Sequence, residues 1–213
     1  MLPLRDTASR RRVPIATLSI IAINLIVFVN QLSMPYDGVI EMLYKYAFIP
    51  SRFVDGLTQI ESYIPLVTSM FIHGDMMHII SNMWSLWLFG DNVEERMGFF
   101  GFIVFYLLTG LIAGFAHFVS NPMSDIPTVG ASGAIAGVMG AYFIMFPHAR
   151  IVTLVPFIPF VLRVPAPIFL FIWFISQLRS GIYGMVGGVA WWAHIFGFLA
   201  GIFLYKRFLK KRF

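Results

Sequence analysis

The pattern of apolar and polar positions divides the sequence into six long apolar runs separated by more polar segments. A transmembrane helix needs about 20 mostly apolar residues, with a range of roughly 17–25. The runs cover residues 13–31, 75–92, 99–119, 131–147, 165–178 and 187–208. The fifth run is the shortest, and the proline-rich stretch 156–167 is a candidate for its backward extension. The pattern predicts an all-α, polytopic membrane protein with six transmembrane helices.

One long segment, residues 32–64, interrupts this pattern between the first and second runs. It mixes charged residues, prolines and glycines with isolated apolar side chains such as Met42, Tyr46 and Phe53. Apolar side chains among polar neighbours are typical of short amphipathic pieces that lie in the membrane interface. Loops this long inside a compact protein are usually functional or disordered. We expect this segment to be a loop that lies on the outer membrane surface.

The composition agrees with a lipid environment. The chain has 213 residues, of which 59% are hydrophobic and 12% are charged, whereas a soluble domain is about 45–50% apolar and about 25% charged. The length suits one domain, and the first run is long enough to span the bilayer rather than be removed as a signal peptide. The absence of cysteine excludes disulfides and cysteine-based metal sites.

The basic residues indicate how the chain is oriented. If the N-terminus is cytoplasmic, only Lys45, Arg52 and Arg179 lie outside, and the other twelve of the fifteen Lys and Arg residues lie inside. This asymmetry supports six spans with residues 1–12 and the C-terminus in the cytoplasm. We expect an integral protein of the plasma (inner) membrane of a prokaryote. The net charge of +5 does not indicate nucleic-acid binding, because no basic groove interleaved with aromatic residues is visible.

Three polar clusters lie within or beside the apolar runs, where polar groups are costly and are functional candidates. The first contains His73, His78 and Asn82. His78 and Asn82 are four residues apart and share one helix face, and Asp75 is a candidate N-cap. A hydrogen-bonded seam between helices is the structural alternative. A metal site is not expected, because the spacing lacks the His-Glu-x-x-His pattern and no span holds an acidic partner.

The second cluster, Gly130-Ala131-Ser132-Gly133, opens the fourth run. The first turn of a helix presents unpaired N–H groups, which can hold the oxyanion that forms when a hydroxyl attacks a carbonyl. Gly130 and Gly133 let a substrate backbone approach Ser132 closely. The structural alternative is a face of small residues, continued by Gly137, for tight helix packing.

The third cluster is His194 with Gly197 and Gly201 in the sixth run. This glycine face can pack against the fourth helix and bring His194 beside Ser132, although a structural histidine is the usual alternative. The predicted helix start places His194 about seven residues, or roughly 10 Å, below the outer surface. The second, fourth and sixth helices all begin outside, so the three clusters can form one pocket in the outer half of the membrane.

Together these motifs resemble the rhomboid family of intramembrane serine proteases. They are His73…His78…Asn82, Gly90-x-x-x-Glu94-x-x-x-Gly98, Gly130-x-Ser132-Gly133 and Ala193-His194-x-x-Gly197-x-x-x-Gly201. The resemblance extends over nearly the whole chain. It implies one rhomboid-like membrane domain over residues 1–213 and a six-helix bundle. It also implies that residues 32–64 are the membrane-lying loop and that the fifth helix is the lateral gate for a substrate helix.

The resemblance also implies the role of each residue. Ser132 corresponds to the nucleophile and His194 to its general base. His78, Asn82 and the Ser132 backbone N–H correspond to the donors that hold the oxyanion, and His73 supports that pocket. The implied activity is intramembrane endopeptidase cleavage of single-span membrane proteins without a metal or other cofactor.

All ten acidic residues lie outside the cores of the apolar runs, which favours a Ser–His dyad over a triad. The chain departs from patterns in some family members at Ile64-Pro65, where those members have Trp-Arg, and at Ala136, where they have an aromatic that stacks on the histidine. Another group must therefore orient His194. A channel or transporter and an inactive chaperone of the same fold are the alternatives, and the presence of both Ser132 and His194 disfavours the second.

Overall fold

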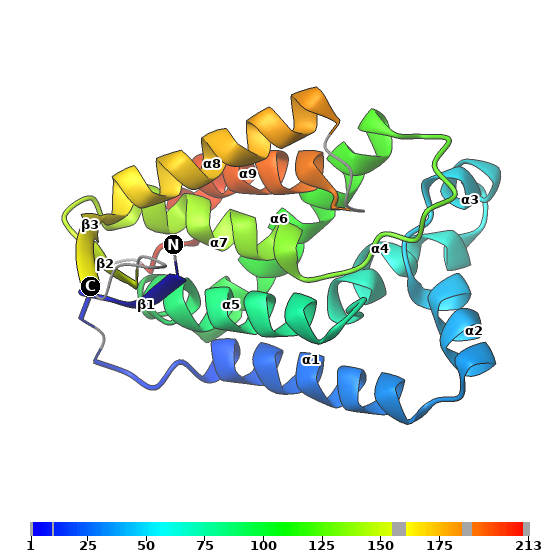
Figure 1. Cartoon of the computed structure of the whole chain (residues 1–213), viewed down its shortest axis with the longest axis horizontal. Coiled ribbons are helices and arrows are strands. Elements are labelled where there is room, and N and C mark those ends of the chain that lie inside the picture. Colours follow the sequence, from blue (N-terminus) through cyan, green and yellow to red (C-terminus); the bar gives the residue numbers. More distant parts are fainter. Residues whose placement is uncertain (1, 10, 155–160, 185–188, 211–213) are drawn as a thin grey trace.

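The structure is a computed structural model that describes residues 2–9, 11–154, 161–184 and 189–210. Helices form most of this part of the chain. Each of the six helices longer than thirteen residues overlaps one of the six apolar runs: α1 (Ile15–Ser33), α5 (Met76–Met97), α6 (Phe99–Ser120), α7 (Ser132–Met145), α8 (Ala166–Tyr183) and α9 (Trp191–Phe208). Figure 1 shows α1, α5, α7 and α8 side by side, with α6 and α9 behind α7.

Among the described helices, α1, α6 and α8 are long and apolar enough to cross a membrane. The other three depart from that standard for visible reasons. Helix α7 is apolar but only 14 residues long, α5 carries four charged residues from Asp91 to Arg96, and α9 ends in Lys206 and Arg207. The chain is thus a mostly helical membrane protein with three candidate spans, and the count of six spans stays a prediction.

Helix α7 lies at the centre of the bundle, and its residues Ala134 to Tyr142 are all buried. Close backbone approach makes this burial possible. A Cβ added to Gly197 or Gly201 of α9 would overlap the carbonyl oxygen of Gly133 or Gly137 on α7, and a Cβ on Gly137 would overlap the side chain of Thr109 on α6. Helices in lipid associate through packing of this kind, so these glycines bring the first turns of α7 and α9 together.

A buried carboxylate joins α5 to the start of α1. Glu94 is only 5% exposed, and its two oxygens accept hydrogen bonds from the backbone N–H groups of Ala16 (2.9 Å) and Thr17 (2.7 Å) and from the Thr17 hydroxyl (2.8 Å). The first N–H groups of a helix lack partners within it, and the helix dipole favours negative charge there. Gly90, one turn before Glu94, allows the same close approach of α5 to α1, because a Cβ on Gly90 would lie only 3.1 Å from the Thr17 side chain.

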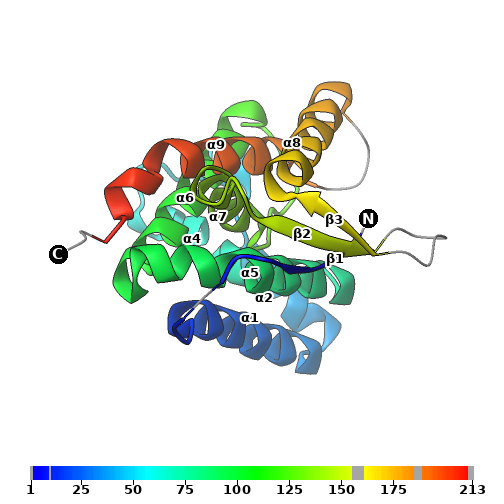
Figure 2. The same cartoon turned by 90° about the vertical axis from the view of Figure 1, so that its left-hand side faces the viewer.

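A small antiparallel sheet at one end of the bundle corrects the prediction of a purely helical chain. Its strands are β1 (Leu2–Asp6), β2 (Arg150–Leu154) and β3 (Val161–Pro165), in the order β1-β2-β3. Figure 2 shows this sheet beside α5 and α8. The β-branched residues of β2 and β3 suit strands. Strand β3 occupies part of the stretch proposed to extend the fifth helix backward, so that α8 begins only at Ala166; residues 156–160 of that stretch lie outside the described residues.

The opposite end of the bundle carries the segment after α1 (Figure 1). It folds into α2 (Tyr36–Tyr46), α3 (Pro50–Asp55), η1 (Ile60–Tyr63), α4 (Pro65–Thr68) and η2 (Ser69–Phe71). The Phe53 ring holds these pieces to α6 through edge contacts with Phe48, Tyr63 and Phe118 at 5.2 to 5.5 Å between ring centroids. A backbone bridge between Phe48 and Thr128 links the segment to the residues that precede α7. Its place on a membrane surface stays a prediction.

Candidate active site

The Ser132 and His194 side chains meet where α7 and α9 begin. The Oγ of Ser132 lies 2.7 Å from Nε2 of His194, and both residues are partly buried. Ser132 is the first residue of α7, as the sequence predicted. His194 is the fourth residue of α9, which begins at Trp191; the predicted start at 187 lies outside the described residues. The expectation that His194 lies about seven residues into its helix is therefore corrected: only three helical residues precede it, because α9 begins later in the sequence than predicted.

Glycine at position 133 allows α7 to pack closely against its neighbours next to Ser132. A Cβ on Gly133 would lie 2.7 Å from the Cβ of Ala113 on α6 and 3.8 Å from the Cβ of Ala193. The first of these distances is too short for two carbon atoms, so any larger residue here would push α7 away from α6. Ala193, which directly precedes His194, lies in ordinary van der Waals contact with the same position, so α7 and α9 also pack together here.

The other ring nitrogen of His194 contacts a residue that the sequence analysis missed. Nδ1 lies 2.8 Å from Oε1 of Gln177, a 7% exposed side chain of α8. The rings of Trp173 and Trp191 flank the imidazole at 6.1 Å between centroids. These contacts orient His194 in place of an aromatic at position 136. The sequence carries a signal for this role, since Gln177 is a strongly polar residue near the end of the fifth apolar run.

His78 faces the serine from the first turns of α5. Asp75 caps this helix, with Oδ1 accepting from the His78 N–H at 2.8 Å. The Gly74 N–H donates to Nδ1 of His78 at 3.4 Å, so the proton of a neutral ring is left on Nε2. That Nε2 is directed at Gly130, because a Cβ at Gly130 would lie only 2.6 Å away.

Asn82 lies one turn further along the same face of α5. Its Nδ2 donates to the His78 carbonyl oxygen at 3.0 Å and lies 3.8 Å from the position of a Cβ on Gly130. An amide nitrogen carries two hydrogens, so one remains for a second acceptor near Gly130. His78 and Asn82 therefore both bring an N–H donor close to Gly130, two residues before the start of α7.

Gly130 holds the backbone in a conformation that favours glycine, with φ of +116°. Its N–H donates to the Ser69 carbonyl oxygen at 2.9 Å, which fixes the loop before α7 against η2. The N–H of Ser132, at the first position of α7, has no acceptor within the helix. The N–H of Ser132 thus lies two residues from Gly130, the position that Nε2 of His78 and Nδ2 of Asn82 approach.

His73 supports His78 by packing. Its side chain is fully buried, and its ring meets the His78 ring edge-on, with centroids 5.0 Å apart and planes at 70°. Its carbonyl oxygen accepts from Nε2 of Gln31 at 2.7 Å, which ties the segment to α1. Across the described ranges, no group of three His, Asp or Glu side chains has the spacing of a metal site.

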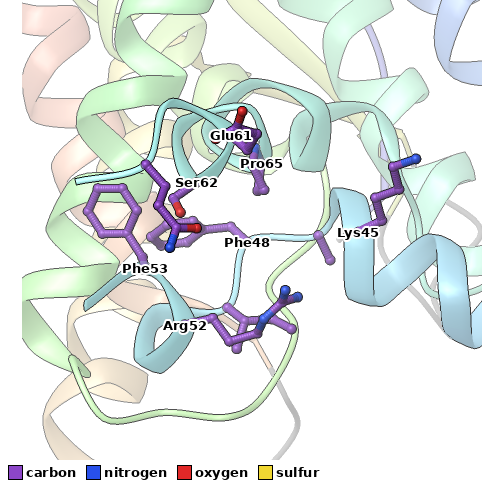
Figure 3. Close-up of a pocket in the computed structure, with 10 residues that line it drawn as sticks. Lys45, Phe48, Arg52, Phe53, Glu61, Ser62 and Pro65 are labelled. Carbon is purple, nitrogen blue, oxygen red and sulfur yellow. The ribbon is translucent and has the colours of Figure 1, made fainter. Parts of the chain in front are cut away.

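Several hollows lie near this end of the molecule, and the following two bear on the site. One of about 40 Å³ borders Ser132, Gly133 and Ala193, and it has room for a water molecule or a small side chain. A pocket of about 210 Å³ lies within the segment between α1 and α5, residues 34–75 (Figure 3). Its lining comes from α2, α3, η1, α4 and the residues between them, with Lys45, Phe48 and Arg52 among it. The larger pocket contains none of the candidate catalytic residues.

The known proteins that are similar to this chain include a mitochondrial, a chloroplastic and a bacterial protein. Rhomboid protein 1 of Saccharomyces cerevisiae mitochondria is 27% identical over 174 residues, which is 79% of this chain and 46% of that protein. Rhomboid-like protein 11 of Arabidopsis thaliana, a chloroplastic protein, is 34% identical over 118 residues, 55% of this chain and 38% of that protein. YdcA of Bacillus subtilis is 35% identical over 80 residues, 38% of this chain and 40% of that protein.

Each match covers less than half of the relative's own length. Because the relatives include mitochondrial and chloroplastic proteins, they do not support the expectation of a prokaryotic plasma membrane. The apolar helices indicate a membrane protein and do not specify which membrane it occupies. The family model of the Rhomboid domain matches residues 61–211, which is more than half of the chain. The chain therefore belongs to the rhomboid family.

Proposed function

We propose that this protein is an intramembrane serine endopeptidase. The observation that carries the proposal is the 2.7 Å contact between Ser132 Oγ and His194 Nε2, at the start of a helix. A nucleophile within hydrogen-bond reach of a base, with donors beside it, is the arrangement that acyl transfer requires. Membership in the rhomboid family supports the same reaction class.

His194 acts as base and then as acid. Its Nε2 takes the Ser132 hydroxyl proton as Oγ attacks the scissile carbonyl carbon, and a tetrahedral intermediate forms. The Nε2 proton then passes to the departing amine nitrogen, the C–N bond breaks, and an ester to Ser132 remains. Water enters and gives its proton to Nε2 while its oxygen attacks the ester. Collapse of the second intermediate returns the proton to Oγ and releases the acid.

The negative oxygen of each intermediate is held by the N–H groups of Ser132, His78 and Asn82. Such donors contribute most when they are fixed before the reaction. His78 is fixed by the Gly74 N–H and the His73 ring, and Asn82 by its bond to the His78 carbonyl oxygen. Gly133, Gly137, Gly197 and Gly201 hold α7 against its neighbours and so fix the first donor.

The proposed substrates are single-span membrane proteins. Six spans, one domain over residues 1–213 and cytoplasmic termini complete the proposal, with the site opening to the outer half of the bilayer. A substrate helix must unwind at the cut, because helical carbonyl groups are shielded, so helix-breaking residues near the cut favour cleavage. The hollow of about 40 Å³ beside Ser132 favours small side chains at the cut.

Labelling with a fluorophosphonate tests the proposal directly. We expect the wild-type chain in detergent to be labelled, whereas Ser132→Ala and His194→Ala are not, because labelling requires an activated hydroxyl. Co-expression with tagged single-span proteins should give fragments with wild type alone. Wild type that is never labelled would favour the inactive chaperone, and solute flux that persists in Ser132→Ala would favour the channel.

A further inference from the structure

We propose that Gln177 on α8 is a positioning residue that selects the tautomer of His194 and holds the ring toward Ser132. The observation is a chain of four hydrogen bonds that begins at the backbone of α8 and ends at the Ser132 hydroxyl. The catalytic meaning of this chain rests on the proposed function. The hydrogen-bond directions, however, follow from the donors and acceptors alone.

The chain begins with a group that can only accept. The Ser176 Oγ lies 2.6 Å from the Trp173 carbonyl oxygen, so the single hydroxyl hydrogen of Ser176 is donated there. The Ser176 oxygen can then only accept from its other neighbour, Nε2 of Gln177, at 3.0 Å. The amide of Gln177 is therefore oriented with its nitrogen toward Ser176 and its oxygen toward His194.

This orientation determines the protonation of the imidazole. The Gln177 oxygen, 2.8 Å from Nδ1 of His194, has no hydrogen to give, so Nδ1 must carry one. A neutral imidazole has one N–H, which leaves a lone pair on Nε2. The Ser132 hydroxyl, 2.7 Å from Nε2, then donates to it. This is the tautomer that a general base needs, and it is set by a neutral amide.

The amide suits this environment better than a carboxylate would. In serine proteases with a triad, an aspartate holds the same ring nitrogen and stabilises the imidazolium. A charge between apolar helices is costly, whereas the Gln177 amide is satisfied on both sides by Ser176 and His194. Gln177 is 7% exposed, so water competes little for its oxygen. Because Gln177 belongs to α8, its hold on His194 requires α8 to keep its place against α9.

The tautomer can be read by nitrogen NMR without any cleavage assay. In a ¹⁵N spectrum of the full chain, labelled with ¹⁵N-histidine and held in micelles, a ring nitrogen that carries a hydrogen is distinguished from one that does not. The signals of His194 are those missing from the His194→Ala spectrum. We expect wild type to have hydrogen on Nδ1 and none on Nε2. The opposite tautomer in wild type overturns the proposal, whatever the variants do.

Three variants of α8 separate positioning from structure. Gln177→Met keeps the length of the side chain but has no strong acceptor. We expect kcat to fall about 10- to 100-fold with KM nearly unchanged, and both His194 tautomers to be present. Gln177→Glu keeps an acceptor oxygen and should restore most of kcat and the Nδ1–H tautomer. Ile175→Ala, on the exposed face of the same helix, is the matched control and should match wild type in both readouts.

The outcomes distinguish this proposal from the proposed function. If Gln177→Met keeps the wild-type kcat and tautomer while Ser132→Ala is inactive, positioning by Gln177 is wrong and proteolysis stands. If wild type is never labelled by the fluorophosphonate yet shows the Nδ1–H tautomer that Gln177→Met loses, the hydrogen-bond assignment stands and proteolysis is wrong. Should Gln177→Met fail to fold, the wild-type spectrum and Gln177→Glu still decide the assignment.

Discussion

Glu94 of α5 accepts two hydrogen bonds from Thr17 of α1, one from its backbone N–H at 2.7 Å and one from its hydroxyl at 2.8 Å. A residue 77 positions away in the sequence thus caps α1, whose own flanking residue Pro14 supplies no side-chain cap. The contact anchors α1 to α5, and α5 carries His78 and Asn82. Loss of Glu94 should therefore affect stability first.

Glu94→Ala should lower the free energy of unfolding by about 2–3 kcal/mol, because it removes a charged acceptor and leaves buried N–H groups without partners. Denaturant or thermal unfolding in detergent measures this loss. The neighbouring Glu95 accepts a hydrogen bond from the Arg11 N–H at 2.9 Å in an exposed setting, so Glu95→Ala is the control and should change stability by less than about 1 kcal/mol. Equal losses in the two variants would contradict the capping role.

Gly201→Ala should destabilise the bundle by about 3 kcal/mol or more, because the new methyl group would overlap the backbone of α7 at Gly137, which cannot move aside as a side chain can. The shift of the melting temperature in detergent measures the effect. Gly114 of α6 is the matched control, since nothing lies within 4 Å of a Cβ added there. Gly114→Ala should be neutral or slightly stabilising, and a comparable loss in both would argue against tight α7–α9 packing.

Gly130→Ala should reduce cleavage more than it reduces stability. The added Cβ would displace Nε2 of His78, and the backbone conformation at φ +116° would be strained. We expect about 1–3 kcal/mol of strain together with a loss of kcat of at least about 100-fold. Gly184 also has positive φ, at +59°, but faces open space. Gly184→Ala should show the strain without the loss of activity. If Gly130→Ala keeps full activity as Gly184→Ala does, the position assigned to Nε2 of His78 beside Gly130 is wrong.

His78→Ala and Asn82→Ala should each lower kcat about 100-fold or more while KM changes little, because each removes a donor that acts on the developing negative oxygen. Initial rates against substrate concentration separate the two constants. The fluorophosphonate should still react with both variants, more slowly than with wild type, since Ser132 and His194 remain paired. A rise in KM at unchanged kcat would instead place these side chains in substrate binding.

Several features of the site could be predicted because their signals are local. Ser132 opens α7 where the glycine and proline pattern placed a helix start, and Asp75 caps α5 as its spacing indicated. Gln177 could not be assigned in this way, because its partner His194 is 17 residues further along the chain and on another helix. The sheet was missed because β1 pairs with β2 across about 150 residues of chain, and neither strand is long enough to give a pattern of its own.

The sequence by itself determined the lipid environment, the places of the long helices and the set of polar residues that they carry. These properties follow from hydrophobicity and from helix-start residues within a few positions of one another. Only the tertiary structure decided which polar groups meet: Ser132 with His194, His194 with Gln177, and Glu94 with Thr17. Such pairings depend on helix rotation and close backbone approach at glycines, and a hydrogen bond tolerates errors of only a few tenths of an ångström.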